Sequence, residues 1–273
     1  MKKRKTLRKL VILFCILLFC IMQNKWLTVS FYTYESDKVT SDLQGYRIVQ
    51  ISDLHNVSFG TENRRLLKRI EKLQPDMIVL TGDMVDSNFT RVDVAINFGK
   101  ECVDLAPTYF VTGNHENWLK SEEKQGLLDD LKQAGVICLE DEISEVVKEN
   151  GKFTLIGLDD ESLVGNRLEM LVKEVDNSRL QILLAHEPQY LEHYATTGVD
   201  LVFSGHAHGG QVRLPFVGGV VAPGQGIFPK YTEGEHVQGE TTMVISRGLG
   251  NSVIPVRLFN PPEIVCVELA SPD

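Results

Sequence analysis

The sequence predicts one α/β domain that follows a membrane-directing segment. Three observations indicate this. Apolar strand-like runs alternate with amphipathic helix-like runs from residue 46 onward, no linker or repeat interrupts them, and an uncharged apolar run follows a basic N-terminus. The 273 residues are 43% hydrophobic and 24% charged, which excludes a disordered or collagen-like chain. We expect residues 1–34 to direct the chain to a membrane and residues 45–270 to fold.

The charge of the chain is unevenly distributed. It has 28 basic and 37 acidic residues, a net charge of −9, and seven of the basic residues precede Glu35. The rest therefore has 21 basic and 37 acidic residues, a net charge of −16. A body this acidic is not expected to hold a nucleic-acid backbone by charge. The five cysteines have no C-x-x-C spacing, which argues against a thiolate metal site.

The N-terminal segment has the pattern of a signal-anchor. Six basic residues precede the apolar run 10–22, which can extend through Trp26 to residue 29 and so approach the length of a membrane-spanning helix. The absence of a small-residue cleavage site favours a retained anchor over a cleaved signal peptide. The basic residues would stay in the cytoplasm, which predicts a single-pass protein of the cell membrane with its domain on the extracytoplasmic side.

Local patterns define the elements of the body. Leu66, Ile70 and Leu73 repeat at helical spacing and predict a helix over 61–73. Ser121 is expected to cap a second helix that Gly135 ends. Short apolar runs predict strands over 46–52, 77–81, 108–112, 136–139, 153–158, 180–185, 201–204, 243–246 and 264–269. The uncharged stretch 215–229 is rich in glycine and proline and predicts a long structured loop.

Five of the expected strands run directly into polar clusters. Binding groups in α/β sheets collect beyond the carboxyl ends of strands, so these clusters are expected to share one crevice. They contain seven potential metal ligands: Asp53, His55, Asp83, Asn114, His186, His206 and His208. Imidazole and oxygen donors suit divalent Zn, Mn or Fe. Seven ligands are too many for one tetrahedral site but suit two sites that share a carboxylate.

Taken together, these motifs resemble the five-block signature of the calcineurin-like metallophosphoesterases. The blocks are Asp53-x-His55, Gly82-Asp83-x-x-Asp86, Gly113-Asn114-His115-Glu116, His186 and Gly205-His206-x-His208. The GHAHGGQ segment, the apolar loop and the SRGLGNSVIPVRLFNPPEI tail are similar to a membrane-associated bacterial branch of that family. The resemblance implies a four-layer α/β/β/α sandwich with two metals at the strand ends.

The resemblance also implies roles for single residues. Asp53, His55 and His208 would hold one metal ion, Asn114, His186 and His206 the other, and Asp83 would bridge them. His115 would face the substrate and stabilise phosphoryl oxygens or protonate the leaving oxygen, and Asp86 would orient His115. Arg247 is a further candidate for contact with a second phosphate.

The expected function is therefore hydrolysis of a phosphodiester or phosphomonoester through a hydroxide that bridges two divalent metals, with Mn, Fe or Zn as candidates. An alternative is a pyrophosphatase acting on a lipid-linked or sugar-nucleotide substrate, as in similar proteins that hydrolyse UDP-2,3-diacylglucosamine. The anchor is compatible with a lipid-linked or a cell-wall-linked substrate. A non-catalytic metal-binding scaffold is a third hypothesis, which the complete ligand set disfavours. No protein partner is predicted.

Overall fold

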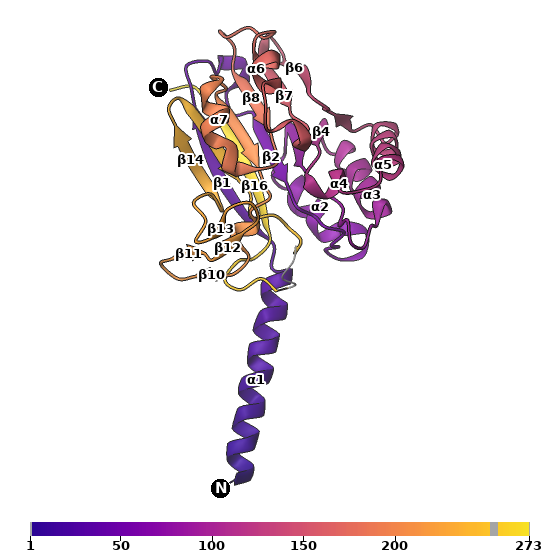
Figure 1. Cartoon of the computed structure of the whole chain (residues 1–273), viewed down its shortest axis with the longest axis vertical. Helices are drawn as coiled ribbons and strands as arrows, with labels where there is room; N and C mark the ends of the chain where they lie inside the picture. The colour runs from indigo at the N-terminus through magenta and orange to yellow at the C-terminus, as the bar shows by residue number, and fades with distance from the viewer. Residues whose placement is uncertain (1, 252–255, 273) are drawn as a thin grey trace.

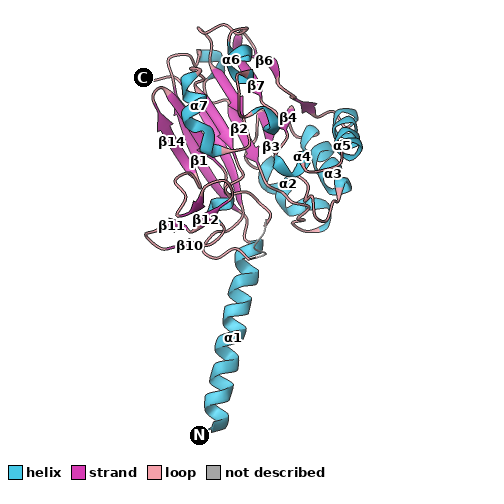
Figure 2. Cartoon of the chain, viewed as in Figure 1, coloured by secondary structure: helices cyan, strands magenta, loops and turns pink. Residues whose placement is uncertain are grey.

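The computed structural model describes residues 2–251 and 256–272 and shows two β-sheets packed face to face with helices outside them (Figures 1 and 2). The first sheet contains, in spatial order, β1 (Thr28–Glu35), β16 (Glu263–Ala270), β2 (Arg47–Ile51), β3 (Met77–Thr81), β4 (Thr108–Val111) and β5 (Ile137–Cys138). The second contains β14 (Gly234–Gln238), β15 (Thr241–Ile245), β9 (Leu201–Ser204), β8 (Gln181–Leu184), β7 (Gly151–Gly157) and β6 (Glu142–Lys148).

Three layers of apolar side chains hold the sandwich together. The central layer lies between the sheets, where Tyr46 meets Phe153 edge to face with ring centroids 5.4 Å apart. The outer face of the first sheet is covered by α2 (Arg64–Glu71), α3 (Val92–Val103) and α5 (Ser121–Gln133). The outer face of the second sheet is covered by α6 (Arg167–Val172) and α7 (Leu191–Thr196). The expected four-layer α/β/β/α architecture is thereby confirmed.

Every strand expected from the sequence is present within two residues of its expected bounds. The helix expected over 61–73 is a short 3₁₀ turn, Thr61–Asn63, followed by α2. One detail differs: Lys120 occupies the N-cap of α5, and Ser121 is the first helical residue with no capping hydrogen bond. The stretch 215–229 contributes to two small hairpins, β10 (Arg213–Leu214) with β11 (Gly218–Gly219) and β12 (Val221–Ala222) with β13 (Gly226–Ile227).

The folded domain begins earlier in the chain than the sequence predicted. Residues 28–34 were expected to lie outside the fold, but β1 runs parallel to β16 from Thr28↔Glu263 to Glu35↔Ala270. Parallel pairing over eight residues makes β1 part of the first sheet. The preceding helix α1 (Lys2–Lys25) projects from the body (Figure 1), and its segment Arg4–Lys25 is long and apolar enough to cross a membrane.

The order of the strands positions the functional residues. β2, β3 and β4 are mutually parallel in the first sheet, as are β7, β8, β9 and β15 in the second. Their carboxyl ends therefore meet along one edge of the sandwich, which is where the five polar clusters follow the strands. Residues 252–255 of the tail quoted above lie outside the described residues.

Candidate metal centre

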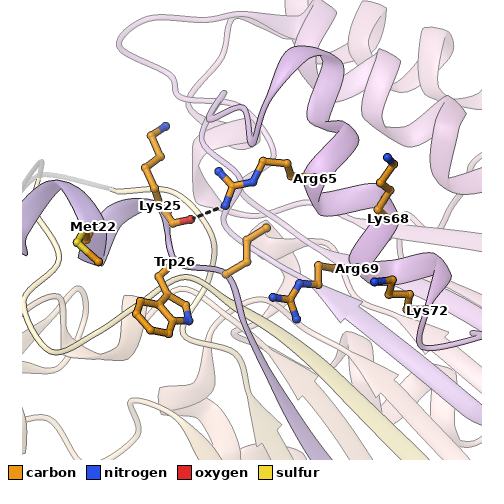
Figure 3. Close-up of a pocket in the computed structure, with 8 residues that line it drawn as sticks. Met22, Lys25, Trp26, Arg65, Lys68, Arg69 and Lys72 are labelled. Carbon is orange, nitrogen blue, oxygen red and sulfur yellow. Dashed lines mark hydrogen bonds between the residues drawn. The ribbon is translucent and has the colours of Figure 1, made fainter.

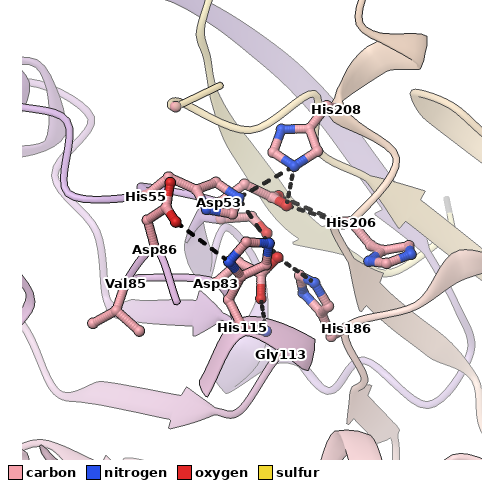
Figure 4. Close-up of polar contacts among 12 residues, drawn as sticks. Asp53, His55, Asp83, Val85, Asp86, Gly113, His115, His186, His206 and His208 are labelled. Atoms are coloured by element: carbon pink, nitrogen blue, oxygen red, sulfur yellow. Dashed lines mark hydrogen bonds and ion pairs between the residues drawn. The ribbon is translucent and has the colours of Figure 1, made fainter. Parts of the chain in front are cut away.

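The residues predicted as ligands converge at this edge of the sandwich. Asp53 follows β2, Asp83 follows β3, His186 follows β8, and His206 follows β9, and their side chains point toward one another (Figure 4). Asn114 begins the short helix α4 (Asn114–Asn117) after β4 and lines the same cavity. All seven side chains are buried. The structure thus brings together every residue that the sequence proposed as a ligand.

The backbone at these positions is unusual. Five of the seven residues have positive φ angles, between 44° and 62°: Asp53, His55, Asp83, His206 and His208. L-residues adopt this left-handed region at a cost, and such strain gathers at functional sites where surrounding structure enforces it. The sharp turns point the side chains back across the sheet edge rather than along the strand.

One group of ligand atoms comes from Asp53, His55, Asp83 and His208. The Nε2 atoms of His55 and His208 lie 3.2 Å apart, His208 Nε2 lies 3.3 Å from Asp53 Oδ1, and His55 Nε2 lies 3.5 Å from Asp83 Oδ2. Atoms that share a cation at about 2.0–2.2 Å lie about 2.8–3.6 Å apart at octahedral to tetrahedral angles. The Nδ1 atoms of both histidines have no hydrogen-bond partner. The spacing therefore fits one shared cation.

A second group comes from Asp83, His186 and His206. His186 Nε2 lies 3.2 Å from Asp83 Oδ2, and His186 Nδ1 lies 2.7 Å from the carbonyl oxygen of Thr81. This contact places a proton on Nδ1 and leaves Nε2 for a ligand, the usual arrangement behind a metal-binding histidine. Asn114 Oδ1 is buried without a partner. Asp83 belongs to both groups, as a bridging carboxylate must.

Burial and neighbouring charges set the pKa values of the ligand side chains so that they can bind a cation. Burial lowers the pKa of His55 to about 4 and of His206 to about 3, so both imidazoles are neutral at pH 7 and can act as ligands. Burial would raise the pKa of Asp83, but the charge and hydrogen bond of His186 outweigh it and hold that pKa well below its usual value. Asp83 in turn raises the pKa of His186 well above 6.5, against the effect of burial. The two buried clusters are consistent with a two-metal site.

A family model described as calcineurin-like phosphoesterase matches residues 46–210, more than half of the chain. The chain belongs to this family. An uncharacterized metallophosphoesterase of Aquifex aeolicus is 32% identical over 257 residues, which cover 91% of this chain and 94% of that protein. Phosphodiesterase YaeI of Escherichia coli is 31% identical over 233 residues, 82% of each chain. The protein is therefore an enzyme of the metallophosphoesterase class.

Solved structures agree on the fold of this metallophosphoesterase. The phosphopantetheinyl hydrolase of Mycobacterium tuberculosis superposes with a TM-score of 0.51 at 13% identity and covers 74% of this chain and 89% of its own. At that identity the likeness concerns the architecture alone.

His115 of the phosphoesterase faces the cavity from α4. Its Nδ1 accepts a hydrogen bond from the backbone N–H of Ser87 at 3.1 Å, while Asp86 Oδ1 lies 4.0 Å away. Asp86 Oδ1 instead accepts the N–H of Asn88 at 2.8 Å. The direct orienting contacts therefore come from Ser87, whose backbone N–H donates to Nδ1 and whose Oγ lies 3.2 Å from the same atom. A contact made by a backbone donor leaves no residue-type signal in the sequence. Asp86 keeps an electrostatic contact with the imidazole.

Glu116 is a second residue whose importance the sequence did not show. Its fully buried carboxylate accepts four backbone N–H groups: Asp83 and Gly113 on Oε2 at 2.8 Å each, Met84 on Oε1 at 2.8 Å and Val85 on Oε1 at 3.1 Å. Burial raises the pKa of Glu116 to about 7. This carboxylate links the loop after β3 to the loop after β4 by hydrogen bonds. It thereby fixes the position of Asp83 relative to His115, whose backbone N–H donates to Asp83 Oδ1 at 2.8 Å.

Arg247 has a different environment from the one expected. Its guanidinium pairs with Glu263 at 2.9 Å and with Glu233 at 3.4 Å, and it donates to Thr28 Oγ1 at 3.1 Å. It does not line the cavity at the metal centre in the part of the chain that the structure describes. These contacts hold Arg247 against the body of the protein. They give the residue a structural role that does not require contact with a substrate.

The cavity of the phosphoesterase opens beside His115. It has a volume of about 130 Å³ and is lined by Asp83, Asp86, Asn88, Asn114, His115, Trp118, His206, His208 and Pro223. Pro223 belongs to the loop between β12 and β13, so the glycine-rich stretch borders the site, as expected. Phe216, Ile227 and Phe228 of the same stretch are exposed. Trp118 and Pro223 add apolar surface to this otherwise polar lining, which suits a phosphoester that carries an apolar group.

Proposed function

We propose that this protein is a membrane-anchored phosphodiesterase of the membrane-associated bacterial branch, with α1 in the cell membrane and the domain on the extracytoplasmic side. The observation that carries the proposed activity is Asp83, a carboxylate shared by two buried ligand groups. Relationship to a phosphodiesterase of Escherichia coli supports the reaction class. The apolar run of α1 and its basic start support the anchor.

Nitrogen and oxygen donors without thiolate fit Mn, Fe or Zn. Asp53, His55 and His208 would hold one ion, Asn114, His186 and His206 the other, and Asp83 both. Two such ions supply an activated water and positive charge for the phosphoryl oxygens. Donation of a proton to the leaving group is assigned to a side chain of the protein.

His115 is the proposed proton donor. Since its Nδ1 accepts from Ser87, the neutral imidazole carries its proton on Nε2. This N–H is positioned to stabilise a phosphoryl oxygen or to protonate the departing oxygen. No serine, threonine or cysteine lines the cavity among the described residues, so attack by water is proposed without a covalent enzyme intermediate.

The apolar Trp118 and Pro223 in the lining of the cavity favour a second candidate, hydrolysis of a pyrophosphate in a lipid-linked or sugar-nucleotide substrate. These side chains would contact the lipid portion while the metal centre holds the phosphates. This candidate uses the same residues and differs only in the bond that is cleaved.

The test uses the full chain in detergent, stripped of metal with a chelator and then supplied with Mn²⁺, Fe²⁺ or Zn²⁺. Bis-p-nitrophenyl phosphate, p-nitrophenyl phosphate and a nucleotide-sugar diphosphate are assayed side by side, with Asp83→Asn as the matched control. Metal-dependent turnover of the diester that Asp83→Asn abolishes is the expected result. Turnover of the nucleotide-sugar alone would favour the second candidate, and no turnover by a folded, metal-loaded chain would contradict both.

A further inference from the structure

A basic groove lies where α1 meets the body, and none of the metal ligands lines it. It has a volume of about 510 Å³ and is lined by Met22, Lys25, Trp26, Leu27, Arg65, Lys68, Arg69 and Lys72. Figure 3 shows Arg65 and Arg69 extending from α2 toward the last turn of α1 and Trp26. We name these residues the junction groove.

The pattern of α2 explains how four cations reach one surface. Arg65, Lys68, Arg69 and Lys72 follow the spacing i, i+3, i+4 and i+7, which places them on one face of the helix or its end. Leu66 and Ile70 on the opposite face are buried in the core. The helix therefore presents an uninterrupted basic surface toward the end of α1.

The cations of the junction groove form no ion pairs among the described residues. Across residues 2–251 and 256–272, no ion pair involves Lys25, Arg65, Lys68, Arg69 or Lys72, whereas the neighbouring Arg64 pairs with Glu62 at 3.7 Å. Arg65 donates to the carbonyl oxygen of Lys25 at 3.3 Å, and Lys25 Nζ lies 5.8 Å from the ring centroid of Phe59. Five positive charges gathered in a chain of net charge −9 would attract an anion from outside the protein.

The position of the groove identifies the source of that anion. Lys9 and Lys25 enclose 15 uncharged residues, which span about 22 Å as a helix, against about 30 Å of hydrocarbon in a bilayer. A short span draws its flanking residues inward, so Lys25 and Trp26 lie at the level of the headgroups. Only Trp26 and Leu27 separate α1 from β1, and Asn24 accepts a hydrogen bond from Asn251 at 2.9 Å. The body therefore approaches the bilayer without a flexible tether.

The geometry points to a binding site for the phosphate of an anionic phospholipid headgroup in the junction groove. The inference rests on the proposed insertion of α1 into a membrane. Arg65 and Arg69 suit two-pronged contact with phosphate oxygens, Lys68 and Lys72 add point charges, and Trp26 and Met22 contact the glycerol and upper acyl chains. The hairpins β10–β11 and β12–β13 lie at the end of the body from which α1 projects (Figure 1), and Phe216 between β10 and β11 and Phe228 after β13 are exposed.

The test measures lipid binding to the delipidated full chain in detergent micelles by native mass spectrometry. Dioleoylphosphatidylglycerol, dioleoylphosphatidylcholine and inorganic phosphate are titrated separately. The variant Lys68→Gln/Arg69→Gln/Lys72→Gln removes three charges and retains the Arg65 contact with Lys25. The control Lys100→Gln/Lys120→Gln/Lys173→Gln removes three exposed charges elsewhere. Each basic residue at an anionic surface contributes about fivefold in affinity, so the groove variant should bind phosphatidylglycerol at least tenfold more weakly.

The control and the charge-preserving Lys68→Arg/Lys72→Arg should bind phosphatidylglycerol as the wild type does. Equal affinity for phosphatidylglycerol and phosphatidylcholine would contradict the proposed site. An equal loss of phosphatidylglycerol affinity in the groove variant and the control variant would contradict it as well. Displacement of phosphatidylglycerol by inorganic phosphate at comparable concentration identifies a soluble-phosphate site and overturns the lipid assignment. Circular dichroism and turnover of a soluble diester verify that the groove variant is folded.

Two further measurements separate this inference from the proposed function. Asp83→Asn should lose hydrolysis and keep its affinity for phosphatidylglycerol. Release of the full chain from membranes by alkaline carbonate would contradict the anchor, whereas the micelle titration measures the groove whether or not α1 spans a bilayer.

Discussion

The buried carboxylate of Glu116 accepts the backbone N–H of Asp83 at 2.8 Å and thereby fixes the residue that belongs to both ligand groups. The same side chain accepts three more N–H groups from the loops after β3 and β4. The geometry of the metal centre therefore depends on a residue that does not touch a metal or a substrate.

Glu116→Gln should weaken both the fold and metal binding. The amide nitrogen of glutamine cannot accept, so about half of the four buried N–H groups lose their acceptor, at a cost of about 2–4 kcal/mol in the free energy of unfolding. Thermal unfolding of the metal-free full chain in detergent measures this effect. The exposed Glu123→Gln on α5 is the matched control, and equal unfolding temperatures of the two variants would contradict the role assigned to Glu116.

Gly205→Ala should abolish metal binding at the Asp53 side of the centre. A Cβ atom at Gly205 would lie 1.9 Å from Ser52 Oγ and 2.5 Å from Asp53 Oδ2, so the carboxylate must move. Metal content after dialysis, measured by mass spectrometry, checks this. Gly126→Ala in α5 has no atom within 4 Å of the new Cβ and should stabilise the protein by about 0.5–1 kcal/mol. Full metal content in Gly205→Ala would refute the packing argument.

His115→Gln should lower kcat by about 10²–10⁴ while metal content is unchanged, because the residue is a proton donor and not a ligand. The loss should be larger for an alkyl leaving group than for p-nitrophenolate, which departs without protonation. Ser87→Ala keeps the backbone N–H that contacts Nδ1 but removes the hydroxyl 3.2 Å from the same atom, so a small loss in kcat is expected. A loss in His115→Gln that is independent of the leaving group would argue for phosphoryl stabilisation alone.

Metal binding at pH 7 should release about one proton per chain. Asp83 raises the pKa of His186 well above 6.5, so metal-free His186 carries a proton on Nε2 that a metal must displace. His55 and His206 have lowered pKa values and contribute none. Metal affinity should therefore increase as pH rises toward the raised pKa of His186. Calorimetric titration in buffers of different ionisation enthalpy counts the protons, and a binding heat that is independent of the buffer would contradict the assignment.

A chain that lacks residues 1–25 should fold, and a chain that lacks residues 1–35 should aggregate. The longer deletion removes β1, exposes the edge of β16 and takes the buried Leu27 from the core. Size-exclusion chromatography of the two products distinguishes them. A monodisperse product from the longer deletion would show that β1 is dispensable.

The strands that end in polar clusters could be predicted from the sequence. They are buried on both faces, so each is a continuous run of apolar residues that is easily recognised. The prediction missed β1, whose polar and aromatic residues alternate directly after an apolar segment, and it placed that strand outside the domain. The contacts of Ser87 and Glu116 could not be predicted, since they join loops that meet only in the folded protein. The left-handed backbone of Asp53 and His208 was equally hidden, because local residue types permit that conformation without requiring it.

The pairing of β1 with β16 has a consequence for biosynthesis. Thr28 pairs with Glu263, 235 positions later, and β16 is the single neighbour of β1 among the described strands of its sheet. During synthesis, the first strand of the domain must wait for the last one to leave the ribosome, long after α1 has emerged. β1 thus stays without its partner strand until the C-terminal part of the domain has been made, and a nascent chain that stops before Glu263 cannot form this pairing.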